Sequence, residues 1–123
     1  MKVLLAEDSG VMRKIIMRGL HSLWVEEVVE AADGAIALDL FEKHGDFNLV
    51  LTDWNMPNMT GLELVKAIRA TGSKVPIMMI TTEAEKARVV EAIQAGINDY
   101  LVKPFDQPML QEKLDRVLPK AKC

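Results

Sequence analysis

The sequence lacks the features that mark several specialised classes of protein. Its single cysteine, Cys123, cannot form a disulfide within the chain, which fits a reducing compartment. No apolar run approaches the roughly 20 residues that span a bilayer, and the first apolar run stops at Glu7 and Asp8, too early for a signal sequence. The net charge of −3 lacks the basic excess of a nucleic-acid-binding protein. We therefore expect a cytoplasmic protein that uses neither a membrane nor nucleic acid.

The residues that are present fit one domain with one core. The 123 residues are of ordinary domain size, and 50% of them are hydrophobic. The sequence contains no internal repeat, low-complexity segment or linker. We predict a single domain over residues 1–123, in which one site must account for the function.

Five short apolar runs alternate with helical patterns along the chain. Strands that alternate with helices pair in parallel through right-handed crossovers, and five such units are too few for an eight-unit barrel. The pattern predicts an α/β fold, a three-layer sandwich with a five-stranded parallel sheet. The expected strands are 3–6, 25–31 (interrupted by glutamates, as an edge strand tolerates), 49–53, 77–80 and 99–102. The expected core positions of the helices are Met12, Ile15, Ile16, Leu20, Leu23, Ala37, Leu40, Phe41, Leu62, Leu64, Val65, Ile68, Val89, Val90, Ile93, Leu110, Leu114, Val117 and Leu118.

Residues typical of helix ends bound the expected helices. Side chains that can accept hydrogen bonds from the first turn precede the helices, and glycines follow three of them. The expected caps are Ser9, Thr60 with Glu63, Thr82 with Glu85, and Asp106, and the expected terminal glycines are Gly45, Gly72 and Gly96.

Asp53 stands out because no structural task explains it. The run 49–51 is continuously apolar, as in a strand buried on both faces, and Asp53 follows before Pro57 prevents the strand from continuing. Capping the next helix would be the simplest structural role, but Thr60 already fills it. Ligands bind at the carboxyl ends of strands in open α/β sheets, so Asp53 is a candidate functional residue.

Other polar residues stand at the same kind of position. Each has a simple structural interpretation: Asp8 as a cap, Thr81 as a strand residue and Lys103 as a surface charge. All parallel strands end at one edge of the sheet, however, so these side chains are expected to meet in one pocket. The set comprises Glu7, Asp8, Asp53, Thr81 and Lys103.

The expected pocket favours phosphoryl chemistry. Three carboxylates in one place repel one another, and magnesium is a hard cation that suits carboxylate oxygens and retained water. A lysine supplies a second positive charge and a threonine hydroxyl a hydrogen bond. Without serine, cysteine or histidine at the centre, the nucleophile would be a carboxylate that forms an aspartyl phosphate.

These residues and their neighbouring motifs resemble the receiver domain of two-component response regulators over the whole chain. The motifs are LLAEDS (4–9), DWNMP (53–57) followed by Gly61, ITTEAEK (80–86) and AGINDYLVKPF (95–105), and they are most similar to the single-domain chemotaxis regulators of that family. The resemblance implies a flavodoxin-like (βα)5 fold with strand order 2-1-3-4-5. It also implies a cis peptide bond between Lys103 and Pro104.

The resemblance further implies a role for each residue. Asp53 would accept a phosphoryl group from a phosphohistidine of a sensor histidine kinase, with Mg²⁺ as cofactor. The phosphoryl group would contact Lys103 and Thr81, and Tyr100 would then turn inward as part of the switch. The metal ligands would be Asp8, Asp53, the backbone carbonyl of Asn55 and, through water, Glu7. Such a chain is not an enzyme, except toward its own phosphorylation and dephosphorylation.

The implied partners follow from the same resemblance. The chain is expected to act by binding another protein, most of all the flagellar motor switch. It is also expected to be a monomer and to be a substrate of a phosphatase. A phosphorelay shuttle or phosphate sink in another two-component pathway remains open. A magnesium phosphohydrolase is disfavoured because Asn55 stands where a second acid is needed. A nucleotide or flavin carrier is disfavoured because no glycine-rich phosphate loop directly follows the first strand, where Gly10 stands alone. Intact Asp53, Thr81 and Lys103 argue against a scaffold that works without phosphorylation.

Three positions depart from the commonest family pattern, one of which is Thr60, where an acid is more usual and the threonine keeps the cap. Glu7 stands where aspartate is more usual, and its longer side chain can still reach a metal through water. Thr82 stands where a small residue is common, and its branched side chain could restrict the inward path of Tyr100.

Overall fold

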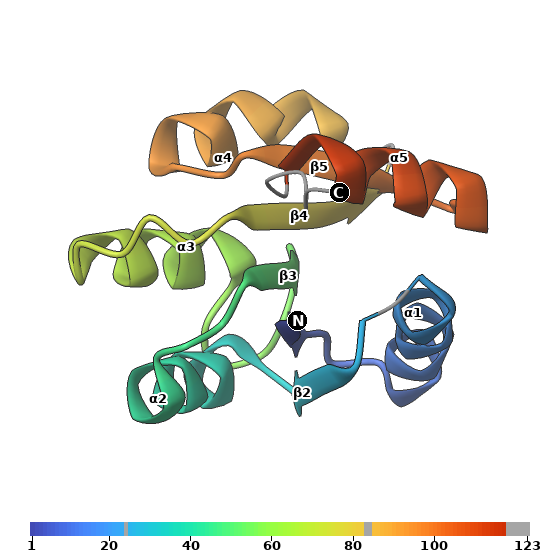
Figure 1. Ribbon diagram of the computed structural model, residues 1–123. Coiled ribbons are helices and arrows are strands. Elements are labelled where there is room, and N and C mark those ends of the chain that lie inside the picture. The colour runs from blue at the N-terminus through green and yellow to red at the C-terminus, as the bar shows by residue number, and fades with distance from the viewer. Residues whose placement is uncertain (24, 83–84, 118–123) are drawn as a thin grey trace.

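The structure is a computed structural model that describes residues 1–23, 25–82 and 85–117. Five parallel strands form one sheet in the order β2-β1-β3-β4-β5, which confirms the predicted topology (Figure 1). The strands are β1 (Lys2–Ala6), β2 (Glu27–Ala31), β3 (Leu49–Asp53), β4 (Ile77–Thr82) and β5 (Asp99–Lys103).

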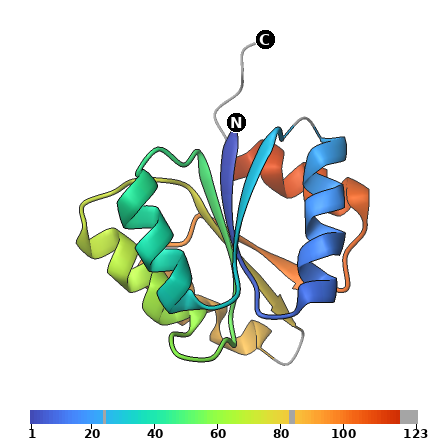
Figure 2. The same ribbon diagram turned by 90° about the horizontal axis from the view of Figure 1, so that it is seen from below.

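Helices cover both faces of the sheet and complete the predicted three layers. One face is covered by α1 (Gly10–Ser22) and α5 (Gln107–Val117), and the other by α2 (Gly34–His44), α3 (Gly61–Ala70) and α4 (Val89–Ala95), as Figures 1 and 2 show. A short 3₁₀ turn, η1 (Lys86–Arg88), leads into α4. None of the described helices is long and apolar enough to cross a membrane.

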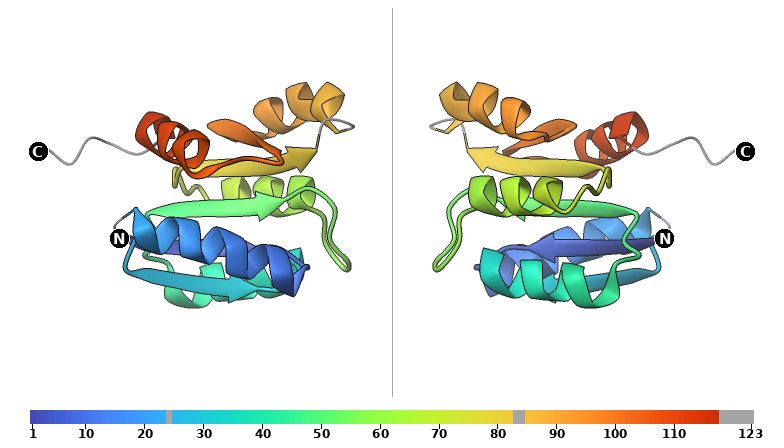
Figure 3. Two further views of the ribbon diagram at one scale, coloured as in Figure 1. Left: turned by 90° about the vertical axis from the view of Figure 1, so that its right-hand side faces the viewer. Right: turned by 90° about the vertical axis from the view of Figure 1, so that its left-hand side faces the viewer.

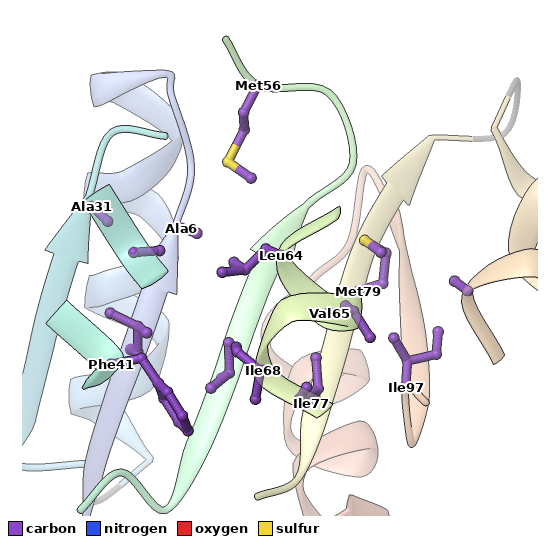
Figure 4. Close-up of a cluster of buried hydrophobic side chains, with 14 of the residues drawn as sticks. Ala6, Ala31, Phe41, Met56, Leu64, Val65, Ile68, Ile77, Met79 and Ile97 are labelled. Atoms are coloured by element: carbon purple, nitrogen blue, oxygen red, sulfur yellow. The ribbon is translucent and has the colours of Figure 1, made fainter. Parts of the chain in front are cut away.

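Each face of the sheet has its own hydrophobic core because side chains alternate along a strand. In β1, Val3 and Leu5 pack toward α1 and α5, whereas Leu4 and Ala6 pack toward α2 and α3. Figure 4 shows part of the core that lies between the sheet and helices α2 and α3. The run 49–51 of β3 is fully buried, as the sequence predicts for a central strand.

The helix ends form as the cap residues predict. Ser9 accepts from the Met12 amide at 3.2 Å, and Asp106 accepts from the Met109 amide at 3.0 Å. Thr60 and Glu63 form both bonds of a capping box. Asp33 is the amino-terminal cap of α2 and accepts from the Ile36 amide at 2.8 Å.

Three expected core positions are wrong. Ile15 is 50% exposed, Val90 62% and Ile93 53%. The apolar stripe of α1 is narrower than the periodicity suggests, and α4 is a short helix that buries Val89 and Ala92 instead. The bonds between Thr82 and Glu85 are present, but η1 follows them and α4 begins only at Val89. Leu118 lies outside the described residues.

Gly61 marks the closest approach between the start of α3 and the end of β3. Its amide donates to the Trp54 carbonyl at 2.8 Å. A Cβ at this position would lie 2.0 Å from the backbone oxygen of Asp53, which cannot move without shifting the strand. Only glycine therefore lets α3 begin beside Asp53.

Gly61→Ala should destabilise the protein by about 1–3 kcal/mol, the usual range for forced overpacking. Urea unfolding would measure the change. Gly10→Ala is the matched control because its Cβ would meet only the flexible Arg13 side chain at 3.7 Å. Equal free energies of unfolding for the two variants would contradict the close approach.

Candidate functional site

The predicted strand ends meet at one edge of the sheet. Ala6 pairs with Thr52, Asp53 with Ile80, and Thr82 with Lys103, so the residues that follow β1 and the last residues of β3, β4 and β5 lie side by side. Figure 3 shows the strands side by side, with their arrowheads at one end of the sheet. The parallel register therefore brings together residues that are up to 96 positions apart in the sequence.

Three carboxylates form the centre of the site. One oxygen from each of Glu7, Asp8 and Asp53 can be chosen so that all three lie within 4.8 Å of one another. Glu7 is 1% exposed and Asp53 7% exposed, whereas Asp8 faces solvent. The cluster is therefore open on the side of Asp8 and enclosed on the side of the sheet.

Lys103 joins two of these acids. Its Nζ lies 3.4 Å from Glu7 Oε1 and 3.4 Å from Asp53 Oδ1. The following peptide bond to Pro104 is cis, as predicted. The partly buried ammonium offsets part of the negative charge of the cluster and holds the two carboxylates toward each other.

Backbone amides fix the orientation of the two buried acids. The Ser9 amide donates to Glu7 Oε2 at 3.1 Å, and the Trp54 amide donates to Asp53 Oδ1 at 2.8 Å. Asp53 Oδ1 thus has both the Trp54 amide and Lys103 as neighbours. Among the described residues, no donor reaches Asp53 Oδ2, which leaves that oxygen for an incoming group.

Burial raises the pKa of two carboxyl groups in the site, Glu7 and Asp53. Burial raises the pKa of Glu7, with the charge of Asp53 adding to it and the Ser9 amide and Lys103 opposing it. Burial also raises the pKa of Asp53, against the opposing effect of Lys103. A raised pKa gives stability that is present below the ordinary carboxyl range and is lost as pH rises through the folded-state pKa. A cation at the cluster would restore that stability at neutral pH.

Thr81 is fully buried at the end of β4, one residue beyond the partner of Asp53. Its hydroxyl lies 3.3 Å from the Thr82 carbonyl oxygen and 3.4 Å from Glu85 Oε1. Glu85 was expected only as a helix-capping residue. Its contact with Thr81 was missed, although Glu85 follows Thr81 by only four residues.

Asn55 and Trp54 follow Asp53 and have different surroundings. Asn55 is exposed, and its side-chain amide donates to Glu85 Oε2. Trp54 is 1% exposed, and the Arg88 guanidinium lies 4.7 Å from the centre of its ring. The loop after β3 and the segment after β4 are thus joined by two separate contacts.

The loop after β3 is also held from the α2 side. The Asn58 side chain donates to Asp33 Oδ2 at 2.7 Å, and its backbone adopts a left-handed conformation with φ of 68°. A Cβ on Gly34 would lie 2.4 Å from the Met59 carbonyl oxygen, so the loop lies directly on the start of α2.

Tyr100 lies on β5 and apart from the acidic cluster. Its half-buried ring has the Lys113 ammonium 4.9 Å from its centre. Lys113 also forms an ion pair with Asp99 at 3.1 Å, which joins α5 to β5. Tyr100 is therefore next to the surface of β5 and α5, where a switch residue is expected.

Known proteins are similar to this chain in sequence and fold. A model of the response regulator receiver domain matches residues 3–115. The chain is 49% identical to a chemotaxis protein CheY homolog of Campylobacter jejuni, with 96% of this chain and 92% of that protein covered. It is 48% identical to chemotaxis protein CheY1 of Helicobacter pylori, with 96% and 97% covered.

Solved structures agree with these relatives. Chemotaxis protein CheY4 of Vibrio cholerae superposes with a TM-score of 0.86 at 39% identity, covering 95% of this chain and 98% of that one. The receiver domain of the response regulator AraT from Geobacillus stearothermophilus gives a TM-score of 0.85 at 35% identity, with 94% and 91% covered. The family model, the sequence relatives and the fold lead to one conclusion: the chain belongs to the family of response regulator receiver domains.

Proposed function

We propose that this chain works as one receiver domain, a phosphorylation-activated switch in which Asp53 accepts the phosphoryl group. The observation that supports this most is the position of Asp53: a nearly buried carboxylate, oriented by the Trp54 amide and Lys103, with its Oδ2 not engaged by the described residues. A phosphohistidine of a sensor histidine kinase is the donor. Asp53 forms an O–P bond as the N–P bond breaks, and the histidine nitrogen keeps the electron pair.

The acidic cluster fits magnesium. Its donors are carboxylate oxygens that lie within 4.8 Å of one another, which is the chemistry that this cation prefers. Asp8, Asp53 and the backbone carbonyl of Asn55 would hold the ion directly, and Glu7 would do so through water. Bound magnesium would neutralise charge on the phosphoryl oxygens.

The surrounding residues have separate roles in the switch. Lys103 neutralises the phosphoryl group and orients Asp53, from which its ammonium is 3.4 Å away. Thr81 donates a hydrogen bond to a phosphoryl oxygen. Tyr100 then turns inward, which changes the surface formed by α4, β5 and α5. A local change of charge thereby selects one of two states of that surface.

The relatives named as chemotaxis proteins support a role in chemotaxis. The protein target is then the flagellar motor switch, and a phosphatase is a further partner. The chain acts as a cytoplasmic monomer, without nucleic acid or membrane, and catalyses only its own phosphorylation and dephosphorylation. A phosphorelay shuttle or phosphate sink would use the same pocket and would differ only in what the phosphorylated chain contacts.

Asp53→Asn should abolish labelling by a small phosphodonor such as acetyl phosphate, because an amide is a poor nucleophile and binds a cation weakly. Mass spectrometry of the intact protein would detect the added phosphoryl group. Asp46→Asn, which changes an exposed carboxylate paired with Lys2, is the matched control. Labelling of Asp53→Asn at the rate of the wild type would place the acceptor elsewhere.

Magnesium should stabilise the folded protein, by about 2.7 kcal/mol at a concentration a hundredfold above Kd. Asp8→Ala should lose most of this gain, because it removes the exposed ligand, while Asp46→Ala should keep it. Protons compete for the same carboxylates, so the gain should shrink as pH falls toward the range in which Glu7 and Asp53 bind protons. A thermal shift in Asp8→Ala equal to that of the wild type would refute the metal site.

The fluorescence of Trp54 should respond to magnesium binding and to phosphorylation. Its amide donates a hydrogen bond to Asp53, and its ring lies beside Arg88. Magnesium and then beryllofluoride, a mimic of the phosphoryl group, should change the signal in two steps. Trp24, the other tryptophan, lies outside the described residues and serves as the comparison. The response should survive in Trp24→Phe and vanish in Trp54→Phe, and the reverse result would mean that the pocket has been misplaced.

A further inference from the structure

Glu85 makes contacts that its role as a helix cap does not require. Its Oε1 accepts from the Thr82 amide at 3.1 Å, which is the expected capping bond. The same oxygen lies 3.4 Å from the Thr81 hydroxyl, and Oε2 accepts from the Asn55 side chain. One carboxylate therefore bridges the end of β4 and the loop that follows Asp53.

The contact with Thr81 competes with the proposed role of Thr81. A hydroxyl has one proton to donate. The Thr81 hydroxyl lies 3.3 Å from the Thr82 carbonyl oxygen and 3.4 Å from Glu85 Oε1, and it cannot give its proton to either of them and to a phosphoryl oxygen at the same time. A hydrogen bond from Thr81 to a phosphoryl oxygen would therefore replace the contact between Thr81 and Glu85.

Charge acts in the same direction. The Glu85 carboxylate contacts the Asn55 side chain two residues after Asp53 and the Thr81 hydroxyl beside the cluster, so it lies close to where the phosphoryl group would arrive. A phosphoryl group carries a charge of about −1.5 to −2 and repels Glu85 more strongly than Asp53 alone does.

Movement of Glu85 would be passed to η1 and α4. The Glu85 amide donates to Thr82 Oγ1 at 3.3 Å, and the Glu85 carbonyl accepts from the Arg88 amide at 2.9 Å. Arg88 in turn covers the ring of Trp54. A change at Glu85 therefore alters the turn from which α4 begins.

We propose that Glu85 is a positioning residue that holds the Thr81 hydroxyl and the Asn55 side chain while Asp53 is unmodified, and that it opposes arrival of the phosphoryl group. This inference rests on the proposed function, because it needs Asp53 to be the acceptor. Its consequence is that the charge and the hydrogen bonds of Glu85 set how readily the site accepts a phosphoryl group.

Beryllofluoride binding to the magnesium-loaded protein, followed by Trp54 fluorescence in the Trp24→Phe background, tests the inference. Glu85→Ala should bind beryllofluoride about fivefold more tightly, since one competing hydrogen bond is removed. Glu85→Gln, which keeps one acceptor oxygen and removes the charge, should fall between Glu85→Ala and the wild type. Asp46→Ala removes an exposed carboxylate that pairs with Lys2 and should leave the affinity unchanged.

Magnesium affinity without beryllofluoride separates this role from a structural one. Removing a negative charge near the cluster should weaken magnesium binding or leave it unchanged while beryllofluoride binding tightens. Damage to the fold would weaken both. Beryllofluoride affinity that is unchanged or weaker in Glu85→Ala would overturn the inference.

Asp53→Asn, measured in parallel, tests the proposed function separately. If the wild type binds beryllofluoride and Asp53→Asn does not, the result supports Asp53 as the acceptor. The comparison of Glu85→Ala with the wild type then decides the further inference. If Asp53→Asn binds as well as the wild type, the proposed function fails whatever Glu85→Ala does.

Discussion

The structure depends on the crowding of three carboxylates and one ammonium group at the carboxyl edge of a parallel sheet. Nearly buried acids that repel each other are unfavourable, and Lys103 offsets only part of that repulsion at 3.4 Å from two of them. Such a cluster persists because two well-packed cores, one on each face of the sheet, hold the strands in register. A change of charge at this cluster would alter the repulsion between these acids.

Much of this arrangement could be predicted from the sequence. Buried apolar runs, cap residues and glycines each act locally, so the strands and most helix ends follow from neighbouring residues. The convergence of Glu7, Asp53 and Lys103 follows from a general rule, because parallel strands end at a common edge. The strand order itself came from the family resemblance, since several orders can accommodate the same local pattern.

The remainder could not be predicted because it depends on packing between distant segments. Ile15, Val90 and Ile93 have the periodicity of core residues, but the width of a helix contact is set by its neighbours. The cap role of Glu85 was visible at a spacing of three residues, whereas its contact with Asn55 joins segments 30 residues apart. Asn58 with Asp33 is a similar case, a contact between two loops that no local pattern indicates.

The close approach of Gly61 to Asp53 has a consequence for the direction in which a signal can travel. On the side of α3, the strand end touches the helix start without room for a methyl group, and the loop between them is bonded to Asp33. On the side of α4, the link runs through side-chain hydrogen bonds at Thr81 and Glu85, which can be exchanged. The contact with α3 is thus tightly packed backbone, whereas the contact toward α4 is made by side-chain hydrogen bonds. If Asp53 accepts a phosphoryl group as proposed, the contacts on the side of α4 can rearrange more easily than those on the side of α3.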